Sequence, residues 1–171
     1  MSAFILSALH SFPDQLEQLY ASVPVPCANW APPSWEGIPS ETFTALEQLC
    51  HIRDIEIEGY HLRFRRLLNE DAPSLASIDS YVVARERGYP DAPPTRILAD
   101  FRAARADTLR MLRALNDADW QRRGSFEGYG PVTVRGLAHY LCSHDQQHLA
   151  GLHWLLGAFD ANYSSSASPM R

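Results

Sequence analysis

The sequence predicts an all-α protein whose main helices form a four-helix bundle. Apolar residues recur every three or four positions in four long stretches, which is the period of helices that bury one face. No stretch shows the strict alternation of apolar and polar residues that is typical of a half-buried surface strand. No internal repeat is visible either. Packing the four apolar faces together is the natural way to remove them from water.

A proline-rich connection separates the first two predicted helices. The first helix should run to about Val23 and break or restart at Pro13, because proline lacks the N–H that bonds within a helix. The five prolines in residues 23–39 predict an extended segment. The second helix should begin at Thr44, since Thr44-Ala-Leu-Glu47 is a capping box in which each end residue bonds the backbone amide of the other.

The second half of the chain contains the other two long helices. The second helix should end near Asn69, and residues 74–87 are only weakly helical. An amphipathic pattern predicts the third long helix over residues 95–115. A loop with three glycines over residues 121–131 should lead to the last helix, which we expect over residues 134–158.

Size and composition indicate one domain. With 171 residues, 46% of them hydrophobic, the chain can build one core, which we expect over residues 1–160, followed by a Ser-rich, disordered tail over 161–171. The N-terminus lacks the basic region of a secretory signal, and no stretch approaches the ~20 apolar residues of a membrane span. Cys27, Cys50 and Cys142 have no C-x-x-C spacing, so they indicate neither disulfides nor a cysteine metal site. We therefore expect a cytoplasmic protein.

The charge of the chain argues against nucleic-acid binding. The net charge is -5, whereas phosphate binding needs a basic face. The 15 residues counted as Lys or Arg are all arginine, and the absence of lysine excludes a Schiff-base nucleophile and a Walker-type phosphate loop. Arginines such as Arg63, Arg85 and Arg87 are able to meet an acidic small-molecule substrate, although the sequence singles out none of them.

Two histidines interrupt the apolar face of the last helix. At ~100° per residue, His144 and His148 fall within the arc that also contains Leu141, Leu152 and Leu155. Buried imidazoles need partners for both ring nitrogens, and two charged rings one turn apart would repel each other. A shared metal ion would satisfy one nitrogen of each neutral ring. The alternative is that each histidine hydrogen-bonds a backbone carbonyl or a carboxylate.

A third histidine and two carboxylates lie on the second helix. His51, on a packed neighbouring helix, would complete a set of three metal ligands. Asp54 and Glu58 lie within ~60° of His51 on a helical wheel, so either is placed to orient a ligand or to hydrogen-bond a metal-bound water. The alternative is that both carboxylates pair with arginines of the same helix on a solvated face.

The other four histidines have different expected roles. His139 and His153 lie ~140° and ~180° from His144 on the wheel, so we expect them on the surface. His10 and His61 belong to no motif, and we expect both to be structural.

Together these motifs resemble those of the DinB-like superfamily of metal-dependent enzymes. One departure is Phe43-Thr44, where relatives often have Trp-Ser, but Thr keeps the cap and Phe keeps an apolar contact. The resemblance covers nearly the whole chain and implies a four-helix bundle of up-down-down-up course, often dimeric, that holds zinc or nickel. The matching segments are His51-Ile-Arg-Asp54-Ile-Glu56, Gly130-Pro-Val-Thr133 and His144-Asp145-Gln-Gln-His148-Leu, which identify His51, His144 and His148 as the implied ligands.

The resemblance also implies a function. A metal held by three neutral histidines keeps open positions, as reactive sites do, and it would acidify a bound water or thiol. Some relatives are thiol-dependent S-transferases or isomerases that use a low-molecular-weight thiol such as mycothiol or bacillithiol, and others are called metal-dependent hydrolases. We therefore expect a homodimeric, metal-dependent thiol S-transferase or hydrolase that acts on a small molecule. The alternatives are a non-catalytic, stress-related metal- or ligand-binding bundle and a purely structural helical dimer.

Overall fold

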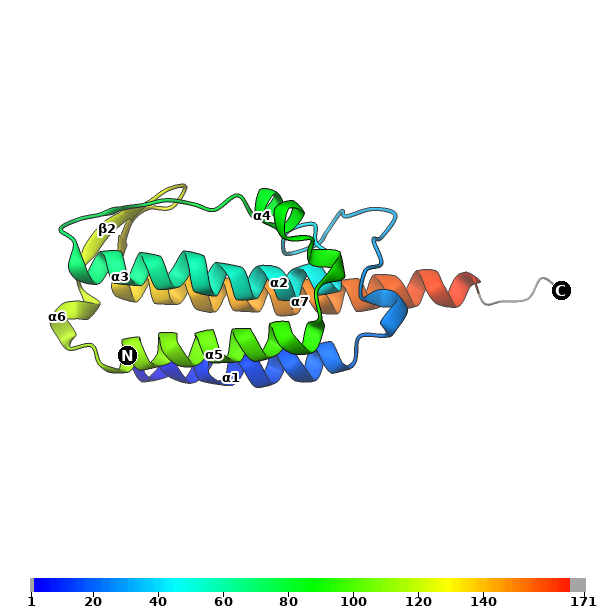
Figure 1. Cartoon of the computed structure of the whole chain (residues 1–171), viewed down its shortest axis with the longest axis horizontal. Helices are drawn as coiled ribbons and strands as arrows, with labels where there is room; N and C mark the ends of the chain where they lie inside the picture. Colours follow the sequence, from blue (N-terminus) through cyan, green and yellow to red (C-terminus); the bar gives the residue numbers. More distant parts are fainter. Residues whose placement is uncertain (1, 167–171) are drawn as a thin grey trace.

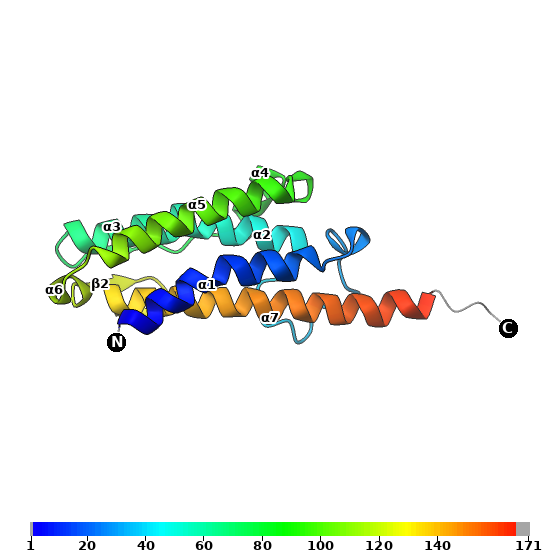
Figure 2. The same ribbon diagram turned by 90° about the horizontal axis from the view of Figure 1, so that it is seen from below.

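The protein is a bundle of four long helices, described for residues 2–166 in a computed structural model (Figure 1). The first and last long helices run in one direction, and the two between them run in the opposite direction (Figures 1 and 2). This up-down-down-up course confirms the predicted fold class. The bundle consists of α1 (Ser2–Ala21), a second long helix formed by α2 (Ala45–Asp54) and α3 (His61–Asn69), α5 (Pro94–Arg113) and α7 (Val134–Ser166).

The second long helix begins as predicted but contains a π-helical segment. Thr44 and Glu47 form the capping box, with the Thr44 amide donating to Glu47 Oε2 at 2.9 Å and the Glu47 amide donating to Thr44 Oγ1 at 3.4 Å. After α2 (Ala45–Asp54), residues Ile55–Tyr60 form one wide π-helical stretch before α3 (His61–Asn69). A π turn holds more residues than an α turn, so it rotates the residues that follow it relative to a regular helix.

Pro13 lies inside α1, which continues through it, so the predicted break is wrong. A proline at this position leaves the carbonyl oxygen of Leu9 without its usual helical N–H donor. Arg105 of α5 fills that role, since its Nη1 donates to the Leu9 oxygen at 3.2 Å. This tertiary hydrogen bond replaces the missing helical one, so the helix continues through Pro13 without leaving the Leu9 carbonyl oxygen unpaired.

Two long connections join the helices. The first contains a 3₁₀ turn at Val25–Cys27 and leads to the capping box. The second returns along the bundle from α3 to the start of α5, which is why these two helices run in the same direction (Figure 1). It contains α4 (Ser80–Arg87) and a 3₁₀ turn at Tyr89–Asp91. A short helix, α6 (Asp117–Trp120), follows α5.

A small sheet replaces the loop that we predicted over residues 121–131. β2 (Arg123–Phe126) pairs antiparallel with β3 (Gly130–Thr133), and β1 (Ser74–Leu75) adds in parallel to β2. Gly128 has φ of 82°, which a turn between two strands can use and which other residues rarely adopt. Strands of two to four residues are too short to show a period of two in the sequence, so the pattern could not reveal them.

The last helix is longer than predicted. α7 continues to Ser166, so residues 161–166 are helical where we expected a disordered tail, and residues 167–171 lie outside the described part of the chain. Phe159 is buried against Trp30, with ring centroids 5.4 Å apart, and stacks on Tyr163 at 4.8 Å. These aromatic contacts stabilise a helical extension that the Ser-rich composition did not predict.

The core consists of two apolar clusters with polar side chains between them. Along α7, Leu141 belongs to one cluster and Leu152 to the other. The buried polar residues Asp145 and His148 lie between these two leucines. The packing of the two apolar clusters does not explain this polar layer in the middle of the bundle.

Among the described helices, none is long and apolar enough to cross a membrane.

Candidate metal centre

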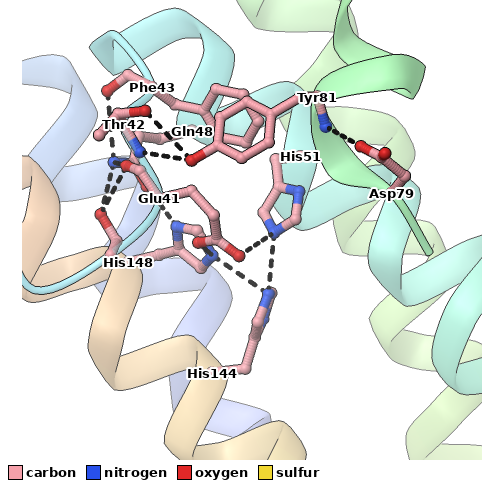
Figure 3. Close-up of polar contacts among 10 residues, drawn as sticks. Glu41, Thr42, Phe43, Gln48, His51, Asp79, Tyr81, His144 and His148 are labelled. Atoms are coloured by element: carbon pink, nitrogen blue, oxygen red, sulfur yellow. Dashed lines mark hydrogen bonds and ion pairs between the residues drawn. The ribbon is translucent and has the colours of Figure 1, made fainter. Parts of the chain in front are cut away.

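The three histidines singled out by the sequence meet in this polar layer. His51 comes from α2, and His144 and His148 come from α7. The Nε2 atom of His144 lies 3.1 Å from Nε2 of His51 and 3.1 Å from Nε2 of His148 (Figure 3). His139 and His153 are exposed, as predicted. His61 is buried and bonds Thr108 Oγ1 at 2.9 Å, which fits its expected structural role.

Gln48 determines which nitrogen of His148 carries the proton. The Gln48 Nε2 group donates to Ser40 Oγ at 2.7 Å and also lies near the backbone oxygens of Glu41 and Phe43. The other end of the amide, Oε1, is therefore an acceptor, and it contacts Nδ1 of His148. His148 must donate from Nδ1, so its Nε2 carries a lone pair that points toward the other two rings.

Two hydrogen bonds cannot account for both short contacts of His144. If its Nε2 is protonated, one proton has to serve both His51 and His148. If its Nε2 is unprotonated, it faces the lone pair of His148 directly. A cation between the rings removes the conflict, because each neutral ring then presents a lone pair to it.

Burial keeps the three rings neutral. It lowers the pKa of His51, opposed by the charges of Glu41 and Asp54. It lowers the pKa of His144 and His148 well below the usual 6.5, and repulsion from the neighbouring rings adds to the effect. Neutral imidazoles are the form that coordinates metal ions.

Glu41 adds a carboxylate to the cluster that the sequence did not predict. Its Oε1 lies 3.5 Å from Nε2 of His51, and its Oε2 lies 3.4 Å from Nε2 of His148. Figure 3 shows the carboxylate pointing between these two rings. About a third of the side chain is exposed, with a relative accessibility of 34%. Glu41 therefore connects the buried histidines with the surface.

The loop that carries Glu41 is held in place from two sides. Tyr81 of α4 contacts Thr42 through its hydroxyl, 3.3 Å from the Thr42 amide and 3.1 Å from Oγ1. On the other side, Gly151 of α7 makes room for the pair formed by Ser40 and Gln48, because a Cβ atom on Gly151 would come within 2.3 Å of Ser40 Oγ. The glycine in the apolar arc of α7 is thus needed for close approach of this loop.

The donor set fits a divalent metal ion. Ligand atoms of Glu41, His51, His144 and His148 all lie within 4.8 Å of one another. Two nitrogens bound to one zinc ion at ~2.1 Å in a tetrahedral arrangement lie ~3.4 Å apart, close to the 3.1 Å that separates the Nε2 atoms here. Imidazole nitrogens and a carboxylate suit zinc, nickel and several other divalent ions.

Asp54 lies near the cluster but does not contact it. Its carboxylate accepts from Arg53 Nε at 2.6 Å and Tyr89 Oη at 2.7 Å, and pairs with Arg87 at 2.9 Å. Burial opposes ionisation, but these partners hold the pKa of Asp54 below its usual value. Within the described residues, Asp54 forms no hydrogen bond with the three histidines, so it acts on His51 through its charge alone.

Glu58 belongs to the surface. It pairs with Arg87 of α4, outside the histidine cluster. The solvated-face alternative is correct for Glu58, although its arginine comes from another element. The wheel placed Glu58 close to His51, but the π-helical segment starts at Ile55 and breaks the regular 100° spacing that this placement assumed.

Two other motif residues, Glu56 and Asp145, form a buried ion-pair network with Arg105. The Arg105 guanidinium donates to Glu56 at 2.9 and 3.1 Å and to Asp145 at 2.7 and 2.9 Å. Thr108 also donates to Glu56, at 2.5 Å. Asp145 follows His144 directly in the sequence, so the network ties α5 and the π-helical segment to the helix that carries two of the histidines.

The residues that the sequence analysis missed left only weak signals. Gln48 lies one turn after the capping residue Thr44, and a lone buried amide has no characteristic pattern. Glu41 lies in a loop three residues before the same cap. Helical spacing says nothing about the direction of a loop side chain, so only the proximity of Glu41 to the start of the His51 helix could have pointed to it.

The metal-free protein should lose stability as the pH falls below 6.5. The folded-state pKa values of His51, His144 and His148 lie below the usual 6.5, so the unfolded chain binds more protons below that pH. The stabilisation is fully present above pH 6.5 and is lost as the pH falls toward the folded-state pKa, by up to ~1.4 kcal/mol per pH unit for each ring. Urea unfolding with a chelator at pH 7.5, 6.5 and 5.5 measures the slope. Equal free energies of unfolding at all three pH values would contradict the expectation.

The fold and the site define a class of helical-bundle proteins with a histidine-rich centre able to hold a metal ion. The sequence matches the DinB superfamily over residues 8–152, and the chain therefore belongs to that family. A comparison with curated proteins gave no match. Among solved structures, the chain is similar to YfiT from Bacillus subtilis, which is described as a probable metal-dependent hydrolase with an unusual four-helix bundle topology. The TM-score is 0.78 at 19% identity, over 95% of this chain and 87% of that one, a likeness that shows the shared fold.

Proposed function

We propose that the protein is a divalent-metal-dependent enzyme acting on a small molecule, with His51, His144 and His148 as the metal ligands. The observation that carries the proposal is the pair of 3.1 Å contacts at His144, which a single proton cannot satisfy. Membership of the DinB superfamily and the four-residue donor set support it. A bound zinc or nickel ion would lower the pKa of a coordinated water or thiol and so supply a nucleophile. The reaction that we propose is accordingly a thiol S-transfer, with a low-molecular-weight thiol, or a hydrolysis.

Glu41 is the residue that we expect to handle protons. It is the one carboxylate of the described donor set, and its oxygens lie 3.4 and 3.5 Å from two of the ring nitrogens. Because the side chain is partly exposed, it can exchange a proton with solvent. It is therefore placed to accept a proton from a nucleophile entering the site and to return it to a leaving group.

We expect Glu41→Gln to keep the metal and lose most of the turnover. Glutamine has a similar size and leaves the three histidine ligands in place, but it cannot accept a proton at neutral pH, and loss of a general base typically costs 10²–10⁴-fold in rate. The measurement combines metal analysis with assays of a chromogenic ester and of a low-molecular-weight thiol with a chromogenic electrophile. Glu58→Gln, which removes a surface carboxylate from the same half of the bundle, is the matched control.

The outcomes separate the parts of the proposal. Protein purified without a chelator or a nickel column should contain about one equivalent of metal per chain. Absence of metal, together with no thermal shift on adding zinc or nickel, would overturn the proposed function. Full turnover in Glu41→Gln with metal retained would remove only the role of Glu41.

A further inference from the structure

Arg63 is a buried guanidinium whose charge no carboxylate balances. Its relative accessibility is 6%, and within the described residues it takes part in no ion pair. Both Nε and Nη2 donate to a single acceptor, the backbone oxygen of Ala76, at 3.2 and 3.0 Å. Burial lowers the pKa of the guanidinium, but an arginine remains charged. Buried charges are normally paired, so an unpaired one inside a protein calls for a ligand.

Arg105 is a buried arginine with a structural role, and its hydrogen-bond partners can be compared with those of Arg63. It is also buried, and its donors are divided between two carboxylates and the carbonyl oxygen of Leu9. Arg63 instead uses one edge, Nε with Nη2, for a carbonyl. The remaining edge, Nη1 with Nη2, has the fork geometry that binds a carboxylate through two parallel hydrogen bonds.

Arg63 lines the same cavity as the histidine cluster. The cavity, of about 110 Å³, is bordered by His51, His144 and Glu41 and also by Arg63, Phe126 and Tyr129. Gly59 leaves room for the guanidinium, because a Cβ atom at this position would lie 2.7 Å from Nη1. At ~30 Å³ per water in the liquid, the space is that of about three to four waters, which suits the carboxylate end of a small molecule such as propionate.

Aromatic rings surround the guanidinium and shape the mouth of the cavity. The Arg63 Cζ atom lies 4.5 Å from the Phe126 ring centroid and 5.5 Å from that of Tyr60. Tyr129, which stacks on Phe126 at 4.6 Å, is 58% exposed and leads from the cavity to solvent. The rings hold the cation in place but cannot neutralise it, and they offer apolar contact to the rest of a bound molecule.

We propose that the substrate carries a carboxylate that pairs with the Nη1 and Nη2 edge of Arg63, which places the reacting part of the molecule at the histidine cluster. The inference rests on the proposed function and names the substrate class for that same site. It requires one anionic group in a small molecule whose remaining part is apolar or aromatic enough to lie against Phe126 and Tyr129. Arg63 is on this view a binding residue, and it should influence KM more than kcat.

Titration with sodium propionate at constant ionic strength tests the proposal. In the wild-type protein we expect propionate to shift the side-chain nitrogen resonances of Arg63 in NMR spectra, with and without zinc, and propionamide to leave them unchanged. Arg63→Gln should weaken propionate binding at least ~10-fold, because a charge-assisted bidentate pair is lost. Arg122→Gln is the control, since Arg122 also donates to backbone carbonyls, at 2.7 and 2.8 Å, but lies outside the cavity. It should bind propionate as the wild type does.

The outcomes distinguish this inference from the proposed function. Unshifted Arg63 resonances, or equal propionate affinity in Arg63→Gln and wild type, would overturn the inference even if zinc binds. Conversely, a protein that binds no zinc but shows the Arg63 response overturns the metal site and leaves the anion site standing. Should Arg63→Gln not fold, the wild-type spectra still decide, and Arg63→Lys, which keeps the charge but not the fork, is expected to bind propionate with intermediate affinity.

Discussion

Replacing His148 by alanine should abolish stoichiometric metal binding. The change removes one of three converging Nε2 atoms and frees Gln48, whose amide orients the ring. Loss of an orienting partner alone typically costs 10–100-fold in metal affinity, so loss of the ligand itself should cost at least ~100-fold. Elemental analysis should find well under one metal per chain, and added zinc should no longer raise the melting temperature.

The interpretation requires that the variant stays folded. His148 is fully buried, and its removal leaves Oε1 of Gln48 without a partner, which should cost ~1–3 kcal/mol. Circular dichroism and urea unfolding measure this cost separately from metal content. His153→Ala is the matched control, because His153 lies on the same helix but is exposed, and it should keep both metal and stability. A folded His148→Ala protein that still holds one equivalent of zinc would refute the proposed ligand set.

The positions of His144 and His148 on the buried face of α7 could be predicted because α7 is a regular helix. Over Val134–Ser166 the 100° spacing holds, so His144 and His148 were placed correctly among buried leucines and His139 and His153 correctly on the surface. The pairing with His51 needed more than periodicity. It depended on two helices being neighbours, which the resemblance supplied and which spacing alone could not.

The second long helix shows where the assumption of a regular 100° spacing per residue fails. Its capping box located the first residue correctly, and its end at Asn69 was also correct. The regular 100° spacing does not hold across the π-helical segment between these points, so it could not place Glu58, which pairs with Arg87 outside the donor set. Such a segment has no sequence signature of its own. Here it coincides with Glu56, which the π geometry directs into the core toward Arg105.

Loops and long-range pairs were the parts that the sequence could not reveal. Gln48 contacts His148 across 100 residues of the chain, and Ser40, which accepts a hydrogen bond from Gln48, packs against Gly151. Likewise, the sequence around Arg63 and Arg105 does not show which of these two arginines pairs with carboxylates. Their different partners, a carbonyl for one and two carboxylates for the other, emerge only from packing.

The second large effect that we expect concerns Arg105, whose replacement by methionine should lower the free energy of unfolding by ~3–5 kcal/mol. Removing one partner from a buried ion pair leaves charges uncompensated, and here Glu56 and Asp145 would both remain inside the bundle. The carbonyl oxygen of Leu9 would also lose the donor that replaces the missing N–H of Pro13. Urea unfolding of the wild type and the variant measures the difference.

Arg102→Met is the control that separates burial from charge. Arg102 lies on the same helix and also pairs with two carboxylates, Asp14 at 2.6 Å and Glu17 at 2.8 Å, but all three side chains are exposed to solvent. Water screens such pairs and solvates whatever is left behind, so its loss should cost only ~0–1 kcal/mol. A similar cost for both variants would show that Glu56 and Asp145 find other partners. A much larger loss of unfolding free energy in the Arg105 variant would show that this one guanidinium holds α1, the π-helical segment and α7 together.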